Sequence, residues 1–164
     1  MPSDPVGPAA LRHVRADGTA HMVDVSQKPV TARRAAAAGR VLLSAPAVEA
    51  LRGGSVPKGD ALGVARLAGI QAVKRTPDLI PLAHPVAVHA VEVDVVVVDE
   101  GVEIRAVVRT ADRTGIEMEA LTAVSVAALA LVDMVKAVDR HARITDVRVT
   151  AKSGGRSGDW EEAT

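Results

Sequence analysis

The chain has 164 residues, enough for one domain with a substantial core; 48% of them are hydrophobic and 24% are charged. Twenty basic and twenty acidic residues give a net charge of zero, which argues against the basic surface of a nucleic-acid-binding protein. There is no Cys, Phe or Tyr and only one Trp, which excludes disulfides and thiolate metal sites and leaves no aromatic platform for stacking a base, apart from Trp160 near the C-terminus.

The two ends of the chain differ from its centre. Residues 1–20 carry three prolines without periodicity, as in a flexible lead-in, and residues 153–164 are expected to form a loose tail rich in Gly and Ser. Residues 21–152 are expected to form the single domain. We see no apolar stretch typical of a signal peptide and no apolar run approaching the length of a membrane span, so a cytoplasmic protein without membrane association is expected.

Hydrophobic patterning predicts seven elements between these ends. They are a strand at 32–43, a helix at 46–52, a helix from 60 to about 75, strands at 86–98 and 102–111, a long helix at about 117–138 and a strand at about 143–151. Ser44 and Asp60 are the expected N-caps of the first two helices. Apart from the extra short helix, the order β-α-α-β-β-α-β predicts a ferredoxin-like α+β fold, an antiparallel sheet with helices on one face.

The long predicted helix is apolar nearly all round, although a helix that covers one face of a sheet needs only one apolar stripe. We therefore expect its outer face to be buried too, most simply against another subunit. At about 100° per residue, one narrow stripe of this helix carries Met118, Thr122, Ser125, Leu129, Asp133 and Lys136. A mostly polar stripe on a buried helix indicates function more strongly than surface charges do.

Three groups of charged residues have both a plain and a functional interpretation. Asp133 and Lys136 form either an ordinary helical ion pair or, if partly desolvated, a proton-transfer pair. Lys58-Gly59-Asp60 is either a helix N-cap with an incidental lysine or a seat for phosphate. The run Lys152-Ser153-Gly154-Gly155-Arg156 is either a solvated tail or a second anion-binding loop.

His84 lies in a loop between two prolines, where it could face a ligand, although a lone His is more often structural. His84 and His89 should face opposite sides of the chain, so no His–His metal site is expected, and we predict neither a metal nor a cofactor. The segment Glu117-Met118-Glu119 opens the long helix. Its carboxylates either favour the helix dipole or accept hydrogen bonds from the N1–H and amino group of guanine.

Three stretches resemble the cyclic pyranopterin monophosphate synthases of molybdenum cofactor biosynthesis: HMVDVS at 21–26, KGDALGVARLAGIQAVKRTPDLIPLAHP at 58–85 and GIEMEALTAVSVAAL at 115–129. The resemblance runs from about His21 to Asp159. It implies a lyase that rearranges the purine of 3′,8-cyclo-7,8-dihydroguanosine triphosphate into a pyranopterin, closes a cyclic phosphate and releases pyrophosphate. It also implies a hexamer built as a trimer of dimers, with the active site at a subunit interface.

The resemblance also implies roles for individual residues. Asp133 matches the family's catalytic aspartate, Lys136 the lysine beside it and Lys58 an active-site lysine, and we expect these three to move protons. The positions implied to contact the substrate ring are Leu82, Ala83, His84, Met118 and Glu119, and those implied for the triphosphate are Arg33, Lys74, Lys152 and Arg156. Ala83 stands where many relatives have Cys, so we expect that no thiol is needed there.

Helix geometry makes a further demand on such a site. Glu119 and Asp133 are fourteen residues apart, so a rise of ~1.5 Å per residue separates them by roughly 21 Å along the helix. We therefore expect an active site that draws residues from two chains. Two other functions stay open: a non-enzymatic nucleotide-sensing regulatory domain, and an RNA-binding module, against which the missing aromatics count.

Overall fold

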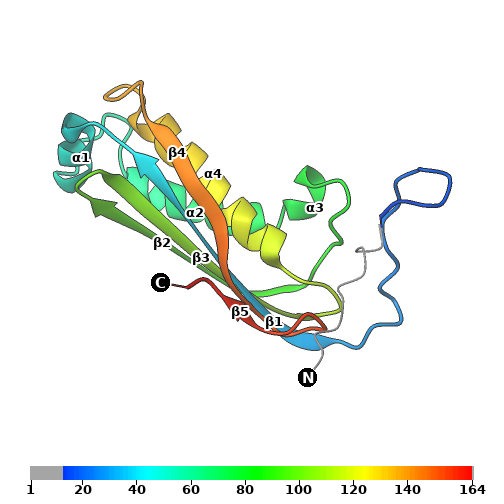
Figure 1. The fold of residues 1–164 in the computed structure, drawn as a ribbon. Coiled ribbons are helices and arrows are strands. Elements are labelled where there is room, and N and C mark those ends of the chain that lie inside the picture. The colour runs from blue at the N-terminus through cyan, green and yellow to red at the C-terminus, as the bar shows by residue number, and fades with distance from the viewer. Residues whose placement is uncertain (1–12, 164) are drawn as a thin grey trace.

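The computed structural model describes residues 13–163, so most of the predicted lead-in lies outside the described residues. Residues 13–20 form an exposed turn that an isolated bridge between Val14 and Ala20 closes. The elements that follow are β1 (Thr31–Leu42), α1 (Ala45–Arg52), α2 (Ala61–Val73), α3 (Thr76–Leu79), β2 (Val88–Val98), β3 (Gly101–Asp112), α4 (Glu117–Val135), β4 (Arg143–Ser153) and β5 (Trp160–Glu161) (Figure 1).

The strands form one sheet in the order β2-β3-β1-β4-β5, in which every pair of neighbours is antiparallel. The helices lie on one side of this sheet (Figure 1). This arrangement confirms the predicted ferredoxin-like α+β fold. The predicted hairpin is β2–β3, and it turns at Gly101, whose φ of 145° favours glycine. A Cβ at that position would lie 1.9 Å from the Val41 carbonyl oxygen, so the turn also needs glycine for space.

The core lies between the sheet and the helix pair α2–α4, and Val, Ala, Leu and Ile build most of it. Small residues bring the two helices close together. A Cβ at Gly69 of α2 would lie 3.0 Å from the Ala123 carbonyl oxygen and 3.2 Å from the Ala127 Cβ. The core is therefore filled by close packing of the two helix backbones, without large aromatic side chains.

By length and composition, α4 could span a bilayer, and it is the only such helix in the part of the chain that the structure describes. This corrects the expectation that no apolar run approaches that length. However, 56% of the stretch is buried inside the fold. Its packing against the sheet and α2 is that of a core helix.

The outer stripe of α4 faces solvent in the single chain. Leu129 is 58% exposed and Met118 is 41% exposed, and Asp133 and Lys136 are exposed as well, whereas Thr122 is buried. Within one chain Asp133 and Lys136 are therefore not buried, and the expectation that another subunit covers this face stays a prediction. Two large exposed apolar side chains on a core helix leave a surface that another subunit could cover.

Several element ends differ from the predictions, and two of the differences go with a specific contact. α2 ends at Val73, with Lys74 as its C-cap, and the buried Thr76 then starts α3, where its Oγ1 donates to the Val73 carbonyl at 3.1 Å. α4 ends at Val135 rather than near 138. The Ser44 side chain makes no cap, and the Ser44 amide instead donates to Asp139 Oδ2 at 2.7 Å.

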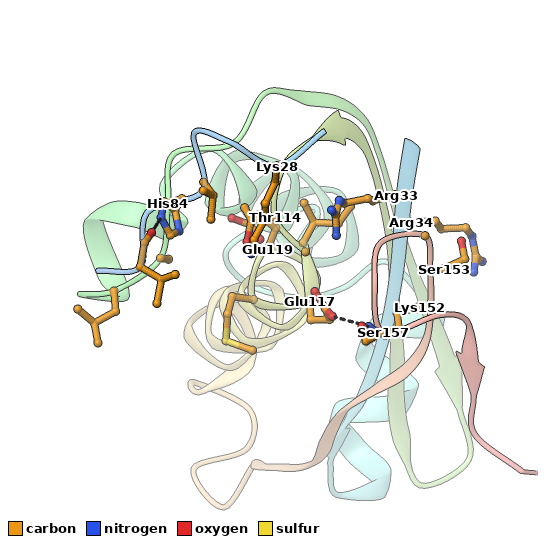
Figure 2. Close-up of a pocket in the computed structure, with 18 of the residues that line it drawn as sticks. Lys28, Arg33, Arg34, His84, Thr114, Glu117, Glu119, Lys152, Ser153 and Ser157 are labelled. Atoms are coloured by element: carbon orange, nitrogen blue, oxygen red, sulfur yellow. Dashed lines mark hydrogen bonds and ion pairs between the residues drawn. The ribbon is translucent and has the colours of Figure 1, made fainter. Parts of the chain in front are cut away.

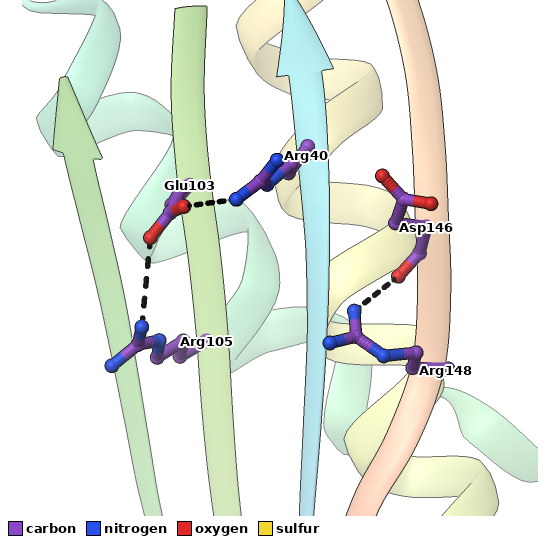
Figure 3. A network of polar contacts seen from close by, with 5 residues as sticks. All are labelled: Arg40, Glu103, Arg105, Asp146 and Arg148. Carbon is purple, nitrogen blue, oxygen red and sulfur yellow. Dashed lines mark hydrogen bonds and ion pairs between the residues drawn. The ribbon is translucent and has the colours of Figure 1, made fainter. Parts of the chain in front are cut away.

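The C-terminal tail contains a short strand, because Trp160 of β5 pairs with Lys152 of β4. The face of the sheet without helices carries charged side chains (Figure 3). There, Arg40 and Arg105 reach the Glu103 carboxylate at 2.7 and 3.5 Å. This face is polar, in contrast to the apolar face under the helices.

Candidate active site

A cavity of about 460 Å³, here called the main cavity, opens at the N-terminal end of α4 (Figure 2). Five parts of the chain line it: the segment after residue 21, the start of β1, the loop before β2, the β3–α4 turn and the end of β4. Of the residues that the sequence singled out, it collects Arg33, Leu82, Ala83, His84, Met118, Glu119 and Lys152. The fold therefore brings together seven side chains from four separate parts of the chain.

Glu119 is the buried acid of the main cavity, with 3% of its surface exposed. Burial raises the pKa of Glu119 to about 7; a hydrogen bond from its own amide opposes the shift, and the nearby Glu117 carboxylate adds to it. Near neutral pH the group is therefore present in both its acid and its carboxylate form. It can donate a hydrogen bond to a bound ligand or accept one.

The loop that carries His84 is fixed to the segment after residue 21. His84 Nε2 lies 2.6 Å from the Val23 carbonyl oxygen, and the Ala83 amide donates to the Ile80 carbonyl at 3.0 Å. A ring nitrogen that meets a carbonyl oxygen must carry the proton, which leaves Nδ1 as the acceptor if the ring is neutral. His84 thus holds two walls of the main cavity together.

Two cations of the main cavity are held in different ways. Lys152 lies 3.6 Å from Glu117 Oε1 and also contacts the Ser157 hydroxyl, so its charge is already partly paired (Figure 2). The Nε of Arg33 donates to the Asp112 carbonyl at 3.0 Å, which is an uncharged acceptor. A Cβ at Gly155 would lie 2.2 Å from Arg33 Nη1, so the glycine turn packs directly against this guanidinium.

The remaining predicted catalytic residues form a separate group at the C-terminal end of α4, here called the Asp133 cluster. Lys136 Nζ lies 2.7 Å from Asp133 Oδ1, and Lys58 Nζ lies 2.8 Å from Oδ2. The hydrogen bond from Lys136 and then that from Lys58 lower the pKa of Asp133 to about 2. Because the Asp133 side chain is 55% exposed, its carboxylate is a solvated anion in the single chain.

The structure thus divides the predicted site residues between the two ends of α4. Arg156 lines a smaller cavity beside the main cavity, together with Lys28 and Arg113, which the sequence did not single out. Both of these missed residues flank stretches that carry the family resemblance, and that adjacency is the signal that could have found them. Lys74 lines neither cavity; it is exposed at the end of α2.

Within residues 13–163, no three His, Asp or Glu side chains gather as metal ligands would. The main cavity and the Asp133 cluster together present carboxyl, ammonium and guanidinium groups and the His84 imidazole. Such a set can bind a phosphorylated ligand and transfer protons.

Comparison with known proteins gives a consistent picture. The family model described as MoaC family matches residues 22–155. A Streptomyces griseus subsp. griseus protein named cyclic pyranopterin monophosphate synthase is 67% identical over 150 residues, which cover 92% of this chain and 85% of the relative. A Corynebacterium glutamicum protein of the same name is 55% identical over 150 residues, covering 92% and 96% of the two chains. The matched range contains every predicted site residue except Arg156, which lies one position beyond it.

Proposed function

Because the chain belongs to the MoaC family, we propose that it catalyses the reaction for which its relatives are named, the synthesis of cyclic pyranopterin monophosphate. In this proposal the enzyme is a cytoplasmic lyase of molybdenum cofactor biosynthesis that acts on the cyclised GTP derivative and releases pyrophosphate. The observation that carries the proposal is the main cavity, which combines a buried carboxyl group of pKa about 7 with cationic side chains.

The chemical demands of the reaction match these groups. To close the cyclic phosphate, a hydroxyl oxygen of the substrate attacks the α-phosphorus while the bond to the oxygen bridging the α- and β-phosphates breaks. The hydroxyl proton passes to a base, and pyrophosphate leaves with the bonding electron pair. Cations beside the phosphates stabilise the leaving charge, and positioned acid–base groups serve the ring rearrangement.

In the proposed site, Glu119 and the Leu82–His84 loop hold the guanine-derived ring, and the Asp133 cluster moves protons. With a pKa of about 2, Asp133 is a weak base while it is solvated. Covering it with substrate and protein would raise the pKa of its carboxyl group toward the range useful for proton transfer.

We also propose that each active site is composite. The main cavity and the Asp133 cluster lie at opposite ends of α4, roughly 21 Å apart at ~1.5 Å per residue, too far for one compact reaction centre. A second copy of the chain that packs on the outer stripe of α4 would cover Met118 and Leu129 and would bring its own Asp133 cluster toward the cavity. A trimer of such dimers is the assembly that we expect.

The direct test is to incubate the purified protein with the cyclised GTP derivative, without added metal or redox cofactor, and to measure product and pyrophosphate. We expect both to form. The second candidate, a nucleotide-sensing regulatory domain, predicts binding without turnover. No product under conditions in which a relative turns over would reject the proposed reaction.

A further inference from the structure

Asp139 is a buried carboxylate that lines neither the main cavity nor the smaller cavity beside it. It is 6% exposed and lies just beyond the end of α4, three positions after Lys136. Its Oδ2 accepts from the Ser44 amide at 2.7 Å, and its Oδ1 accepts from the His141 amide at 2.8 Å. These hydrogen bonds, led by that of Ser44, hold the pKa of Asp139 below its usual value. Near neutral pH the group is therefore a carboxylate with two amide donors.

The bond to Ser44 joins two parts of the chain that are far apart in sequence. Ser44 is the N-cap residue of α1, and Asp139 follows α4, 95 residues further along. The amides of Val138 and Asp139 both donate to the Val135 carbonyl, at 2.8 and 2.9 Å, so Asp139 is itself fixed to the last turn of α4. Both α1 and the C-terminal end of α4 lie at the same end of the molecule (Figure 1). The Asp139 carboxylate therefore holds the start of α1 against the end of α4.

Lys58 of the Asp133 cluster belongs to the segment that follows α1. Directly after α1 the chain stays in a hydrogen-bonded turn, in which the Ser55 amide donates to the Ala50 carbonyl at 2.9 Å. The next residue, Val56, is buried, with 7% of its surface exposed. The segment from α1 to Lys58 is therefore compact, and the position of α1 determines where Lys58 meets Asp133.

The contact that results is exposed, whereas its support is buried. Lys58 Nζ lies 2.8 Å from Asp133 Oδ2, and the two side chains are 40% and 55% exposed. An exposed ion pair contributes little to holding its own geometry. Lys136 needs no long-range support, because it lies three positions from Asp133 on the same stretch of chain. The contact with Lys58 is the one that a buried anchor has to maintain.

We infer that Asp139 is a positioning residue of the active site, which keeps Lys58 against Asp133 by fixing α1 to the end of α4. It rests on the proposed function in one respect, namely that the Asp133 cluster moves protons. If Asp139 lost one of its acceptor oxygens, a buried amide would be left unpaired and the two segments would shift apart. Small displacements of this kind weaken short contacts and slow the chemistry that depends on them.

The test follows the pKa of the Asp133 carboxyl group by carbon-13 NMR, because the hydrogen bonds from Lys136 and Lys58 lower it to about 2. Asp139→Asn keeps the size of the side chain, but it replaces one acceptor oxygen by a nitrogen that only donates. We expect it to raise the pKa of Asp133 by about one pH unit, the lower end of the usual effect of a nearby opposite charge. Lys58→Ala should cause a similar rise. Adding Asp139→Asn to Lys58→Ala should cause no further rise, because a residue that acts through Lys58 has no effect without it.

Two further variants control for a general loosening of the fold. Asp112→Asn removes the same kind of support at the main-cavity end, where the Asp112 carboxylate also accepts from two backbone amides, and it should leave the pKa of Asp133 unchanged. Ser44→Pro removes the amide donor at a residue whose φ of −67° proline can adopt. It should raise the pKa of Asp133 as Asp139→Asn does, and it gives the same comparison if Asp139→Asn does not fold. Each titration extends down to the lowest pH at which far-UV circular dichroism shows that protein folded.

The outcomes separate this inference from the proposed reaction. A raised pKa of Asp133 in Asp139→Asn and Ser44→Pro, in a protein that makes no product, would support the anchor and reject the reaction. In an active protein, Asp139→Asn should also lower kcat on the order of tenfold with KM unchanged. An unchanged kcat would overturn the role in positioning. An unchanged pKa of Asp133 in both variants, or an equal rise in Asp112→Asn, would overturn it as well and leave the reaction standing.

Discussion

Two glutamates in the first turn of α4 have opposite surroundings. Glu117 is paired with Lys152 and its side chain is 30% exposed, while Glu119, two residues on, is 3% exposed. The difference arises because helix positions two residues apart point in directions about 200° apart, at about 100° per residue. The buried Glu119 is therefore placed to exchange a proton with a ligand near neutral pH.

The first prediction concerns the pH dependence of stability. Because the pKa of Glu119 is raised in the folded state, the folded state binds more protons between about pH 4.5 and 7, and stability falls as pH rises through that window. The whole effect is on the order of 3 kcal/mol and is complete above about pH 7. Glu119→Gln should remove this pH dependence. The free energy of unfolding of the variant should therefore rise relative to that of the wild type between pH 5 and pH 8.

Urea unfolding at both pH values, at one fixed protein concentration, measures this gain. Glu49→Gln, at a glutamate whose side chain is 76% exposed, is the control and should track the wild type. If wild type and Glu119→Gln differed in free energy of unfolding by the same amount at both pH values, the raised pKa of Glu119 would be contradicted.

The second prediction concerns the Asp133 cluster. Asp133→Asn should lower turnover by at least ~10²-fold, the usual cost of losing an acid–base group, while leaving the fold intact because the side chain is half exposed. The matched control is Asp78→Asn, which also breaks an exposed pair with a basic residue three positions away. Steady-state rates decide, and near-normal turnover in Asp133→Asn would make its ion pairs merely structural.

At the scale of elements, the sequence predicted the features that depend on residues close together in the chain. Alternation predicted the β2–β3 hairpin, and Asp60 indeed caps α2, accepting from the Gly63 amide at 2.8 Å. The sequence pattern did not predict α3 or β5. α3 depends on the burial of Thr76 in the folded domain, and β5 depends on pairing with β4. Such contacts leave no periodic trace in the sequence.

The candidate site shows the same division. Spacing placed Asp133 beside Lys136, and the structure confirms that contact. Their contact with Lys58, 75 residues away from Asp133, could not follow from spacing. Lys28 and Arg113 were missed because nothing in the sequence distinguishes a cavity-lining lysine or arginine from an ordinary one on the surface.

The third prediction tests the close contact between α2 and α4. Gly69→Val should destabilise the protein by about 2 kcal/mol, because overpacking a filled core typically costs 1–3 kcal/mol. Gln71→Val places the same side chain in the same helix at an exposed position and should change stability by only a few tenths of a kcal/mol. Chemical denaturation measures the free energy of unfolding of both variants. Equal effects would mean that α2 and α4 are not closely packed at Gly69.

At the scale of the whole molecule, the separation of the main cavity from the Asp133 cluster is the dominant fact. Lys58 and Asp133 belong to one cluster of one chain. Complementation between subunits therefore has to combine one mutation from each end of α4.

The fourth prediction is that Glu119→Gln and Asp133→Asn subunits, each nearly inactive alone, regain activity when mixed. In a dimer of one subunit of each kind, one site carries both mutations and the other carries none. Random mixing should therefore restore about one quarter of wild-type activity, since half of the dimers are mixed and each has one intact site of two. Co-expression with two affinity tags isolates the mixed species. No recovery, or full activity in a monomer, would refute the composite site.

The pairing of Trp160 with Lys152 places the protein's one fluorescent side chain beside the main cavity. With no Tyr or Phe, its intrinsic fluorescence above 280 nm excitation comes from one indole, which is 49% exposed and sits on the strand next to the main cavity. Emission from the unlabelled protein therefore reports on the tail and its cavity, and it says little about the core. A change in emission on adding pyrophosphate would be a local signal, whereas a thermal melt followed by the same light would record the release of β5, which can precede the unfolding of the domain.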